Sequence, residues 1–218
     1  MKPLAYDISP VISPKLGVFP GDQPFSREVV MSFTKGDHLE LSRMTSTVHL
    51  GAHADAPSHY HEEGVSIDQR PWQIYLGKAQ VIRVTGLSPK ARVEPKHIKT
   101  QIEAPRVLID TCSFPDPNKW NSNFNSFSPE LLEFLAGRGV KLVGIDTPSV
   151  DPEDSKALES HQILFKRDLA VLEGLLLKEV PEGLYTLIAL PLRIAGADAS
   201  PVRALLLGVD YFSQVGDS

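Results

Sequence analysis

Histidine and carboxylate side chains are concentrated in one stretch of the chain, His49 to His59, which reads His-Leu-Gly-Ala-His-Ala-Asp-Ala-Pro-Ser-His. It contains three of the seven histidines, together with Asp55. Imidazole and carboxylate ligands suit a borderline divalent ion such as zinc, with manganese as the alternative where carboxylates dominate the set. Because burial of such groups without partners costs a few kcal/mol each, the stretch predicts a metal site. The competing interpretation is a solvated polar loop.

We expect this stretch to form a β-strand that leads into a turn. On a strand, alternate residues from His49 to Asp55 share one face, and the small apolar residues between them share the other. A helix would also bring His49 and His53 together, at positions i and i+4. Pro57 disfavours a helical conformation at the residue before it, and Gly51 would weaken a helix, so the strand is preferred.

Two more polar residues lie further along the chain in apolar surroundings. Glu173 interrupts the almost wholly apolar run 169–177. A buried carboxylate is rarely left without a partner, and a metal ion would satisfy it; the alternative is a side chain that points outward at the end of a strand. His161 lies in an expected helix over 154–165, nearly on one face with Ala157 and Leu164.

The stretch from Phe19 to Phe25 has a Pro-Gly-Asp centre, which predicts a tight turn with aromatic residues on both sides. One interpretation is a surface loop. The functional interpretation is a rim over a pocket, in which Phe19 supplies a flat apolar wall.

Cys112 is the only cysteine, which excludes an internal disulfide and a cysteine-rich zinc site. It ends an apolar run, where a free cysteine is typically a small buried residue, so we expect packing rather than a nucleophilic role. The remaining histidines with no predicted function, His38, His61 and His97, lie in polar or charged surroundings and are expected at the surface.

The elements that must position these residues include more strands than helices. Apolar, often β-branched runs predict strands at 79–84, 106–110, 141–146, 184–192 and 201–209. Ser128, Pro129, an acidic first turn and Gly137 predict a helix over 128–137, and residues 113–127 are expected to form a loop. Since strands and helices do not alternate strictly, the pattern predicts a mixed class, α/β or α+β.

Length and composition indicate one ordinary globular domain over residues 1–218, with 42% hydrophobic and 22% charged residues. The net charge is −5, and the basic residues are scattered, which argues against nucleic acid as a partner. The first seven residues lack a signal-peptide pattern, and no apolar run approaches roughly 18 residues, the length of a membrane span. We therefore expect a cytoplasmic protein without a membrane segment.

With these residues identified, the chain resembles the cyclase-type metal-dependent hydrolases, and within them the bacterial kynurenine formamidases, or arylformamidases. The pattern His-x-Gly-x-His-x-Asp-x-Pro-x-His is complete in residues 49–59. Further matching segments are residues 19–22, 144–152, 155–161, 172–174, 189–192 and 198–203, so the resemblance extends over nearly the whole chain.

The resemblance implies a swivelling β/β/α-type fold, dimers or larger homo-oligomers, and two zinc ions per subunit. By this similarity, the ligands of one ion are His49, His53 and Asp55, and a ligand of the second is His161. Asp55 and Glu173 resemble bridging ligands, and His59 matches the proton-transferring histidine. Phe19 replaces a substrate-contacting Trp, and Gln162 replaces a second His that often follows the ligand.

The implied reaction is hydrolysis of N-formyl-L-kynurenine to L-kynurenine and formate, in tryptophan breakdown. A zinc-bound water can ionise near pH 7 and attack the formyl carbon, while His59 protonates the departing aryl amine. Three alternatives remain. An isatin hydrolase-like enzyme would use the same metals on a cyclic amide, a serine hydrolase is disfavoured because no Gly-x-Ser-x-Gly occurs, and a structural metal-binding protein would typically have a closed four-ligand site.

Overall fold

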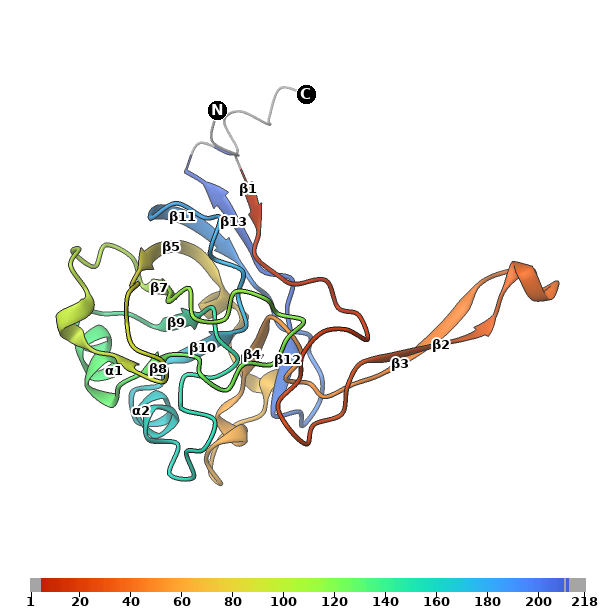
Figure 1. Ribbon diagram of the computed structural model, residues 1–218, viewed down its shortest axis with the longest axis horizontal. Coiled ribbons are helices and arrows are strands. Elements are labelled where there is room, and N and C mark those ends of the chain that lie inside the picture. Colours follow the sequence, from red (N-terminus) through yellow and green to blue (C-terminus); the bar gives the residue numbers. More distant parts are fainter. Residues whose placement is uncertain (1–4, 210, 212–218) are drawn as a thin grey trace.

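A large mixed sheet forms the centre of the computed structural model, which describes residues 5–209 and residue 211 (Figure 1). Within these residues, nine strands are hydrogen-bonded in the order β1-β13-β11-β5-β7-β9-β10-β4-β12. In this spatial order the strands are β1 (Ala5–Asp7), β13 (Leu205–Gly208), β11 (Gly183–Ile188), β5 (Leu76–Arg83), β7 (Arg106–Asp110), β9 (Leu142–Ile145), β10 (Ala170–Glu173), β4 (His53–Asp55) and β12 (Ala199–Pro201).

The middle of this sheet is parallel, and its two sides are antiparallel. Strands β5, β7, β9 and β10 pair in parallel, whereas β11 on one side and β4 on the other pair antiparallel with them. The parallel strands β7, β9 and β10 are apolar over nearly their whole length and almost entirely buried. Such continuous apolar runs are typical of parallel strands covered on both faces.

Two clusters of buried apolar residues fill the two faces of the sheet. Alternate residues of β7 belong to different clusters: Val107 and Ile109 to one, Leu108 to the other. The first cluster also contains Leu131, Leu132 and Leu135 of helix α1 (Pro129–Ala136) and Leu164 of helix α2 (Glu159–Arg167). Both helices therefore cover the same face of the sheet.

The prediction of helix α1 is confirmed, and the residues that start and end this helix lie directly beside it. The Ser128 hydroxyl accepts a hydrogen bond from the Leu131 N–H at 3.2 Å, and Gly137 follows the last turn. Helix α2 begins five residues later than predicted. Leu158 has a left-handed conformation, φ 47°, which no helix accommodates, and the first helical N–H groups bond instead to the carboxylate of Asp151.

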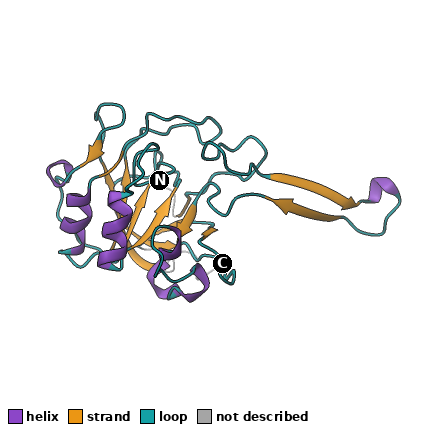
Figure 2. Cartoon of the chain, turned by 90° about the horizontal axis from the view of Figure 1, so that it is seen from below, coloured by secondary structure: helices purple, strands orange, loops and turns teal. Residues whose placement is uncertain are grey.

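Two further pairs of strands lie outside the large sheet, and neither was predicted. Strands β2 (Ser26–Met31) and β3 (Leu41–Thr45) form an antiparallel arm that extends far from the body (Figures 1 and 2). Strands β6 (Arg92–Val93) and β8 (Ser126–Phe127) form a short parallel pair. The 3₁₀ helices are η1 (Phe33–Lys35), η2 (Pro57–His59), η3 (Ile67–Gln69), η4 (Trp72–Tyr75) and η5 (Pro95–His97).

The predicted strands are all present, with changed bounds. β5 begins three residues before the predicted segment, and β11 ends at Ile188, three residues before Pro191. Residues 201–209 are divided between the end of β12 and β13. The predicted loop 113–127 is a loop except for β8 at its end.

The prediction of a buried Cys112 is wrong. The chain leaves β7 at Asp110, and Cys112 then adopts φ 57°, which turns its side chain to the exposed surface. Its thiol lies 3.4 Å from Asp110 Oδ1, and partial loss of contact with water together with that negative charge raises the pKa of Cys112 to about 11. The prediction for His61 is also inaccurate, because its ring is partly buried and stacked on Phe165, with centroids 3.5 Å apart. None of the described helices has the length and apolar character needed to cross a membrane.

Candidate metal centre

The histidine-rich stretch is held between two strands of the large sheet. Strand β4 pairs antiparallel with β10, which places His53 opposite Glu173, and with β12, which places Asp55 opposite Ala199. The strand is shorter than predicted because Gly51 has φ +60°, so His49 lies in a turn before it. His59 follows on η2, the predicted turn after the strand.

Four side chains from three distant segments meet at one buried point. His53, Asp55, His161 and Glu173 are each at least 97% buried. His53 Nε2 lies 3.3 Å from Asp55 Oδ1 and 3.4 Å from Glu173 Oε2. His161 Nε2 lies 3.5 Å from Asp55 Oδ2 and 3.7 Å from Glu173 Oε1. Each carboxylate therefore faces both imidazoles, the arrangement expected of bridging ligands.

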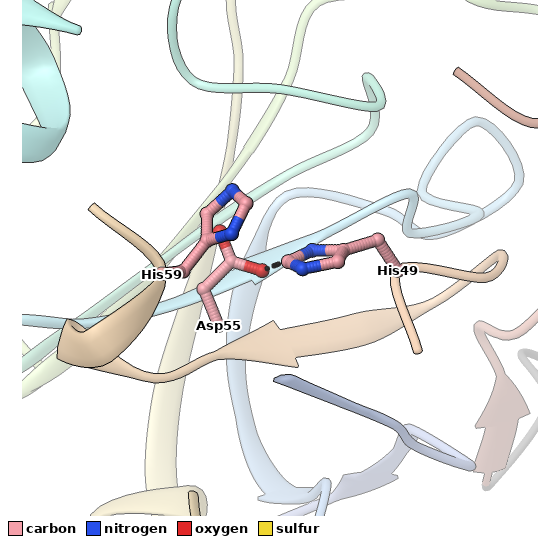
Figure 3. A group of neighbouring side chains, drawn as sticks. All are labelled: His49, Asp55 and His59. Carbon is pink, nitrogen blue, oxygen red and sulfur yellow. Dashed lines mark ion pairs between the residues drawn. The ribbon is translucent and has the colours of Figure 1, made fainter. Parts of the chain in front are cut away.

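His49 and His59 complete the centre on its open side. His49 Nδ1 lies 3.0 Å from Asp55 Oδ1, and the ring centroids of His49 and His59 are 4.1 Å apart. Figure 3 shows the Asp55 carboxylate turned toward the ring of His49, with His59 beside it. Two sets have ligand atoms all within 4.8 Å of one another: His49, Asp55 and His59, and His53, Asp55 and Glu173. His59 therefore lies within 4.8 Å of Asp55, further away than His49, His53 and His161, which lie 3.0–3.5 Å from it.

The donor atoms fit divalent metal ions. Both oxygens of Asp55 and Nε2 of His161 are buried without a hydrogen-bond partner among the described residues, although imidazole nitrogens lie close to them. Buried polar atoms are rarely left in this state. Ligands 2.0–2.1 Å from a tetrahedral zinc ion are separated by about 3.3 Å. The 3.0–3.7 Å separations found here match that spacing.

Hydrogen bonds on the far side of each ring determine which nitrogen faces the centre. His53 Nδ1 lies 2.9 Å from the Gly51 carbonyl oxygen, and His161 Nδ1 lies 2.8 Å from Asp151 Oδ2. We assign N–H donors to these positions, which leaves the lone pair of Nε2 directed inward. His49 has the reverse arrangement, with Nε2 2.9 Å from Asp198 Oδ2 and Nδ1 facing Asp55.

Sequence reasoning missed the roles of Asp151 and Asp198, which both lie within segments that carry the family resemblance. A carboxylate ten residues before a ligand histidine is a signal that could have identified Asp151. Gln162, at the position of a frequent second histidine, points away from the centre and donates to the Tyr60 carbonyl oxygen at 3.0 Å.

The pKa values of the two buried histidines show that the carboxylates of the centre attract positive charge. Burial alone would lower the pKa of His53, but the nearby carboxylates of Asp55 and Glu173 outweigh it and raise that pKa to about 10. The pKa of His161 is also raised to about 10, since Asp151 and Asp55 outweigh the effect of burial. Without metal these histidines carry protons between the carboxylates, and a divalent ion that binds there must displace them.

A cavity of about 680 Å³ opens over the centre. Its lining includes His49, His53, His59, His161 and Glu173, together with three aromatic side chains: Phe19, Phe114 and Trp120. The predicted turn at Phe19 is present, closed by a 2.9 Å hydrogen bond from the Asp22 N–H to the Phe19 carbonyl oxygen. The ring of Phe19 packs edge to face on Trp120, with centroids 5.1 Å apart. Trp120, in the expected loop, was not singled out from the sequence.

The structure thus brings the predicted site residues together, and all of them except the buried Asp55 line one cavity. His49, His53, Asp55, His161 and Glu173 surround one buried region, and His59 and Phe19 line the space above it. Their roles as ligands, proton donor and substrate contact stay predictions.

Comparison with known protein families shows to which family the chain belongs. The sequence model of the Cyclase family matches residues 6–152, about two thirds of the chain. The chain belongs to the cyclase family. The matched region of this cyclase-family protein includes the whole of residues 49–59 but ends before His161 and Glu173, so the fold is what connects these two residues to the rest of the centre.

Solved structures are similar over nearly the entire cyclase-family chain. A protein described as a potential metal-dependent hydrolase with cyclase activity is 28% identical, with a TM-score of 0.80 over 93% of this chain and 96% of its own. A predicted metal-dependent hydrolase from Bacillus stearothermophilus is also 28% identical, with a TM-score of 0.77 and coverages of 93% and 97%. An isatin hydrolase bound to the product analogue thioisatinate has a TM-score of 0.80 at 20% identity, with coverages of 93% and 91%. The predicted mixed α/β class is confirmed.

Proposed function

We propose that this protein is a metal-dependent hydrolase that converts N-formyl-L-kynurenine to L-kynurenine and formate. The observation that carries the proposal is the set of buried ligand atoms on Asp55 and His161 that have no hydrogen-bond partner among the described residues, in a centre whose His161 and Glu173 line a cavity of about 680 Å³. Buried polar atoms are rarely left without a partner, and a bound metal ion would supply one. The two 28% identical proteins described as metal-dependent hydrolases support the same reaction class.

The proposed cofactors are two zinc ions, with manganese as the alternative. His49, His53 and Asp55 would hold one ion and His161 would help to hold the other, with Asp55 and Glu173 as the bridging ligands. When bound, such ions supply Lewis acidity that activates a water molecule and polarises a carbonyl group. The protein contributes a carboxylate-rich, buried donor set with one open side, which differs from the closed sites of structural zinc.

His59 is proposed to move the proton that the reaction requires. Water adds to the formyl carbon, the bond from that carbon to the aryl nitrogen breaks, and the nitrogen must gain a proton because an aryl amide anion leaves poorly. Burial and the neighbouring histidines lower the pKa of His59, so its imidazole is neutral near pH 7 and can take a proton from the attacking water. The same ring then returns that proton to the departing nitrogen.

The wall of the cavity is suited to an aromatic substrate. Phe19 and Trp120 line the cavity and present apolar ring surfaces to it. An aryl ring packed there would gain the edge-to-face or offset contacts that aromatic pairs favour. This arrangement supports an aryl formamide rather than a purely aliphatic amide.

The decisive experiment is turnover of N-formylkynurenine by purified, zinc-loaded protein, with formate release as the measurement. We expect a chelator to abolish turnover and zinc to restore it. His59→Ala should lower kcat by 10²–10⁴-fold, the usual contribution of a positioned acid–base group. No turnover in the loaded wild type, or full activity in His59→Ala, would refute the assignment.

Isatin is the second candidate substrate, because Phe19 replaces the expected Trp and isatin hydrolases share this fold. Ring opening of isatin breaks a cyclic amide by the same addition of water. A direct comparison of kcat/KM on isatin and N-formylkynurenine discriminates between the two. A higher value for isatin would replace the formamidase proposal with the lactam one.

We also propose that the protein forms a homodimer or a larger homo-oligomer through the β2–β3 arm. Its side chains pack against little else in the described chain, and Phe33 and Met44 are 67% and 73% exposed. A lone two-stranded hairpin is marginally stable in water, and exposed apolar side chains mark interaction sites. A second copy of this chain is the occupant we propose.

A further inference from the structure

Asp198 contacts two histidines of the centre with one oxygen atom. Its Oδ2 lies 2.9 Å from His49 Nε2 and 3.4 Å from His59 Nδ1. The residue directly precedes β12, and its carbonyl oxygen accepts the Ala56 N–H at 2.8 Å. The pairing of β12 with β4 therefore fixes the backbone of Asp198 beside the end of the metal-binding strand.

The side chain of Asp198 contributes little to the stability of the core. It is 47% exposed and lines the cavity, whereas Asp55 is fully buried. An exposed carboxylate near a histidine gains little net stability from the pair. Its position over the cavity instead indicates an effect on the two rings that it contacts.

The ring of His49 has two possible neutral tautomers, and Asp198 distinguishes them. With the proton on Nε2, the ring donates to Asp198, and the lone pair of Nδ1 faces the centre. With the proton on Nδ1, the ring would donate to Asp55 Oδ1, which is only 3.0 Å away, and could not bind an ion. Without Asp198 the second tautomer becomes competitive, because Asp55 is then the only strong acceptor beside the ring.

The ring of His59 contacts the same oxygen through Nδ1, at 3.4 Å. Its side chain is 35% exposed, and the nearest carboxylate contact of Nδ1 is Asp198 Oδ2. A ring held at one nitrogen keeps the other nitrogen in a constant orientation at the cavity. This orientation is a requirement for transferring a proton to a bound substrate.

We propose that Asp198 is a positioning residue that selects the metal-binding tautomer of His49 and the orientation of His59, and thereby links metal binding to proton transfer. The inference rests on the proposed metal centre, but it does not depend on which amide is the substrate. It adds a role for a residue that is neither a ligand nor the proton donor.

Metal affinity and histidine NMR test the part that concerns His49. In Asp198→Ala we expect zinc titration against a competing chelator to show one of the two ions bound 10–100-fold more weakly, as when other outer partners of ligand histidines are lost. Nitrogen-15 spectra of the zinc-loaded wild type should show one histidine bound through Nδ1 with a proton on Nε2, a signature that the variant loses. Unchanged affinity and an unchanged spectrum would overturn the proposal.

Two further variants separate a specific effect from a general one. Asp154→Ala removes an exposed carboxylate outside the cavity lining and should leave both zinc affinities and the spectrum unchanged. Asp198→Asn keeps the shape and one acceptor oxygen, so it should fold, retain the His49 tautomer and lose less affinity than Asp198→Ala. Equal losses in the Asn and Ala variants would contradict selection of the tautomer.

Kinetics at saturating zinc test the part that concerns His59. Asp198→Ala should lower kcat at least tenfold with little change in KM, because orientation and not substrate binding is lost. Added to His59→Ala, it should lower kcat no further, since a positioning residue acts only through the ring it positions. Full additivity would refute this link. If N-formylkynurenine is not the substrate, the affinity and NMR measurements still decide the His49 part.

Discussion

At the scale of single residues, Asp55 is the group on which the whole centre depends. Its two oxygens face His49, His53 and His161, and neither has a hydrogen-bond partner among the described residues. Burial opposes its charge, but His49 and the other histidines outweigh burial and hold its pKa well below the usual range. Asp55 therefore stays ionised at every pH at which the protein is expected to work.

Asp55→Asn tests this dependence. The amide keeps the size of the side chain but removes its charge and one acceptor oxygen, so neither ion keeps its shared ligand. We expect metal content per chain, measured by elemental analysis after gel filtration, to fall from two ions to fewer than one. Asp154→Asn, an exposed site, should retain both ions. Two ions retained in Asp55→Asn would contradict the bridging role.

Asp146 offers a separate prediction about pH and stability. Burial, with the nearby charge of Asp110, raises its pKa to about 7 from the ordinary 3.8. The folded protein then holds this proton more tightly than the unfolded chain does, so the contribution of Asp146 to stability falls as pH rises from about 4 to about 7. Its oxygen accepts from the Thr111 N–H and hydroxyl, which an Asn oxygen can also do.

Asp146→Asn should therefore become more stable relative to wild type as the pH increases. We expect the difference in unfolding free energy between variant and wild type to grow by more than about 1 kcal/mol from pH 5 to pH 8. Urea unfolding at the two pH values is the measurement, with metal removed from both proteins. A difference that is constant with pH, or that shrinks, would show that the Asp146 carboxyl titrates normally.

The types of the site residues could be predicted from sequence, but their pairings could not. Three histidines and Asp55 within eleven residues indicate a metal site by residue type and spacing alone. Glu173 was identified because a charged side chain in an apolar run needs a partner. The contact of Asp198 with His49 spans 149 positions and depends on the register of β12 against β4. No local pattern encodes such a register.

At the scale of elements, two glycines allow the segments of the centre to approach one another. Gly174 follows Glu173 at the end of β10 with φ +66°, and a Cβ there would lie 2.2 Å from the Gly51 carbonyl oxygen. That same carbonyl receives the hydrogen bond of His53 Nδ1. The close backbone contact therefore supports both a ligand histidine and a ligand carboxylate.

Gly174→Ala should destabilise the protein and disrupt the centre together. The variant combines a left-handed conformation, which costs about 1–2 kcal/mol for a residue with a side chain, with a backbone clash that forces β10 and the Gly51 turn apart. We expect more than about 2 kcal/mol loss in chemical unfolding and weaker zinc binding. Gly86→Ala is the control, since Gly86 has φ +78° and open space at its Cβ position. It should show only the conformational cost, and equal losses in both variants would remove the role of close approach.

A helix or strand was predicted accurately where the sequence signals for its two ends lie close to the element itself. Helix α1 has its cap, its first-turn proline and its final glycine within ten residues, and it was predicted almost to the residue. The start of α2 was missed because Asp151, several residues upstream, takes the place of a local cap. Strand β4 was predicted too long because the left-handed Gly51 was treated as compatible with an extended chain.

At the scale of the whole molecule, the sheet order and the arm were beyond prediction. Most strands were found, but the sequence does not show that β4 inserts between β10 and β12, which is a pairing of segments more than a hundred positions apart. The arm was missed because its strands pack on no core and therefore lack the alternation of a half-buried strand. A projecting arm with exposed apolar side chains is typical of an interaction site.

The last prediction concerns the arm, whose apolar side chains should hold the proposed oligomer together. Charged replacements at Phe33 and Met44, tested as the double variant Phe33→Asp with Met44→Glu, should leave the unfolding free energy of a dilute sample nearly unchanged, because both side chains are exposed in the single chain. The same replacements should shift the mass in light scattering from a multiple of 23.9 kDa to 23.9 kDa. Trp72→Gln changes a residue of the body that is 56% exposed and should not alter the mass. A wild type that is already monomeric, or dissociation by Trp72→Gln alone, would place the partner of this arm elsewhere.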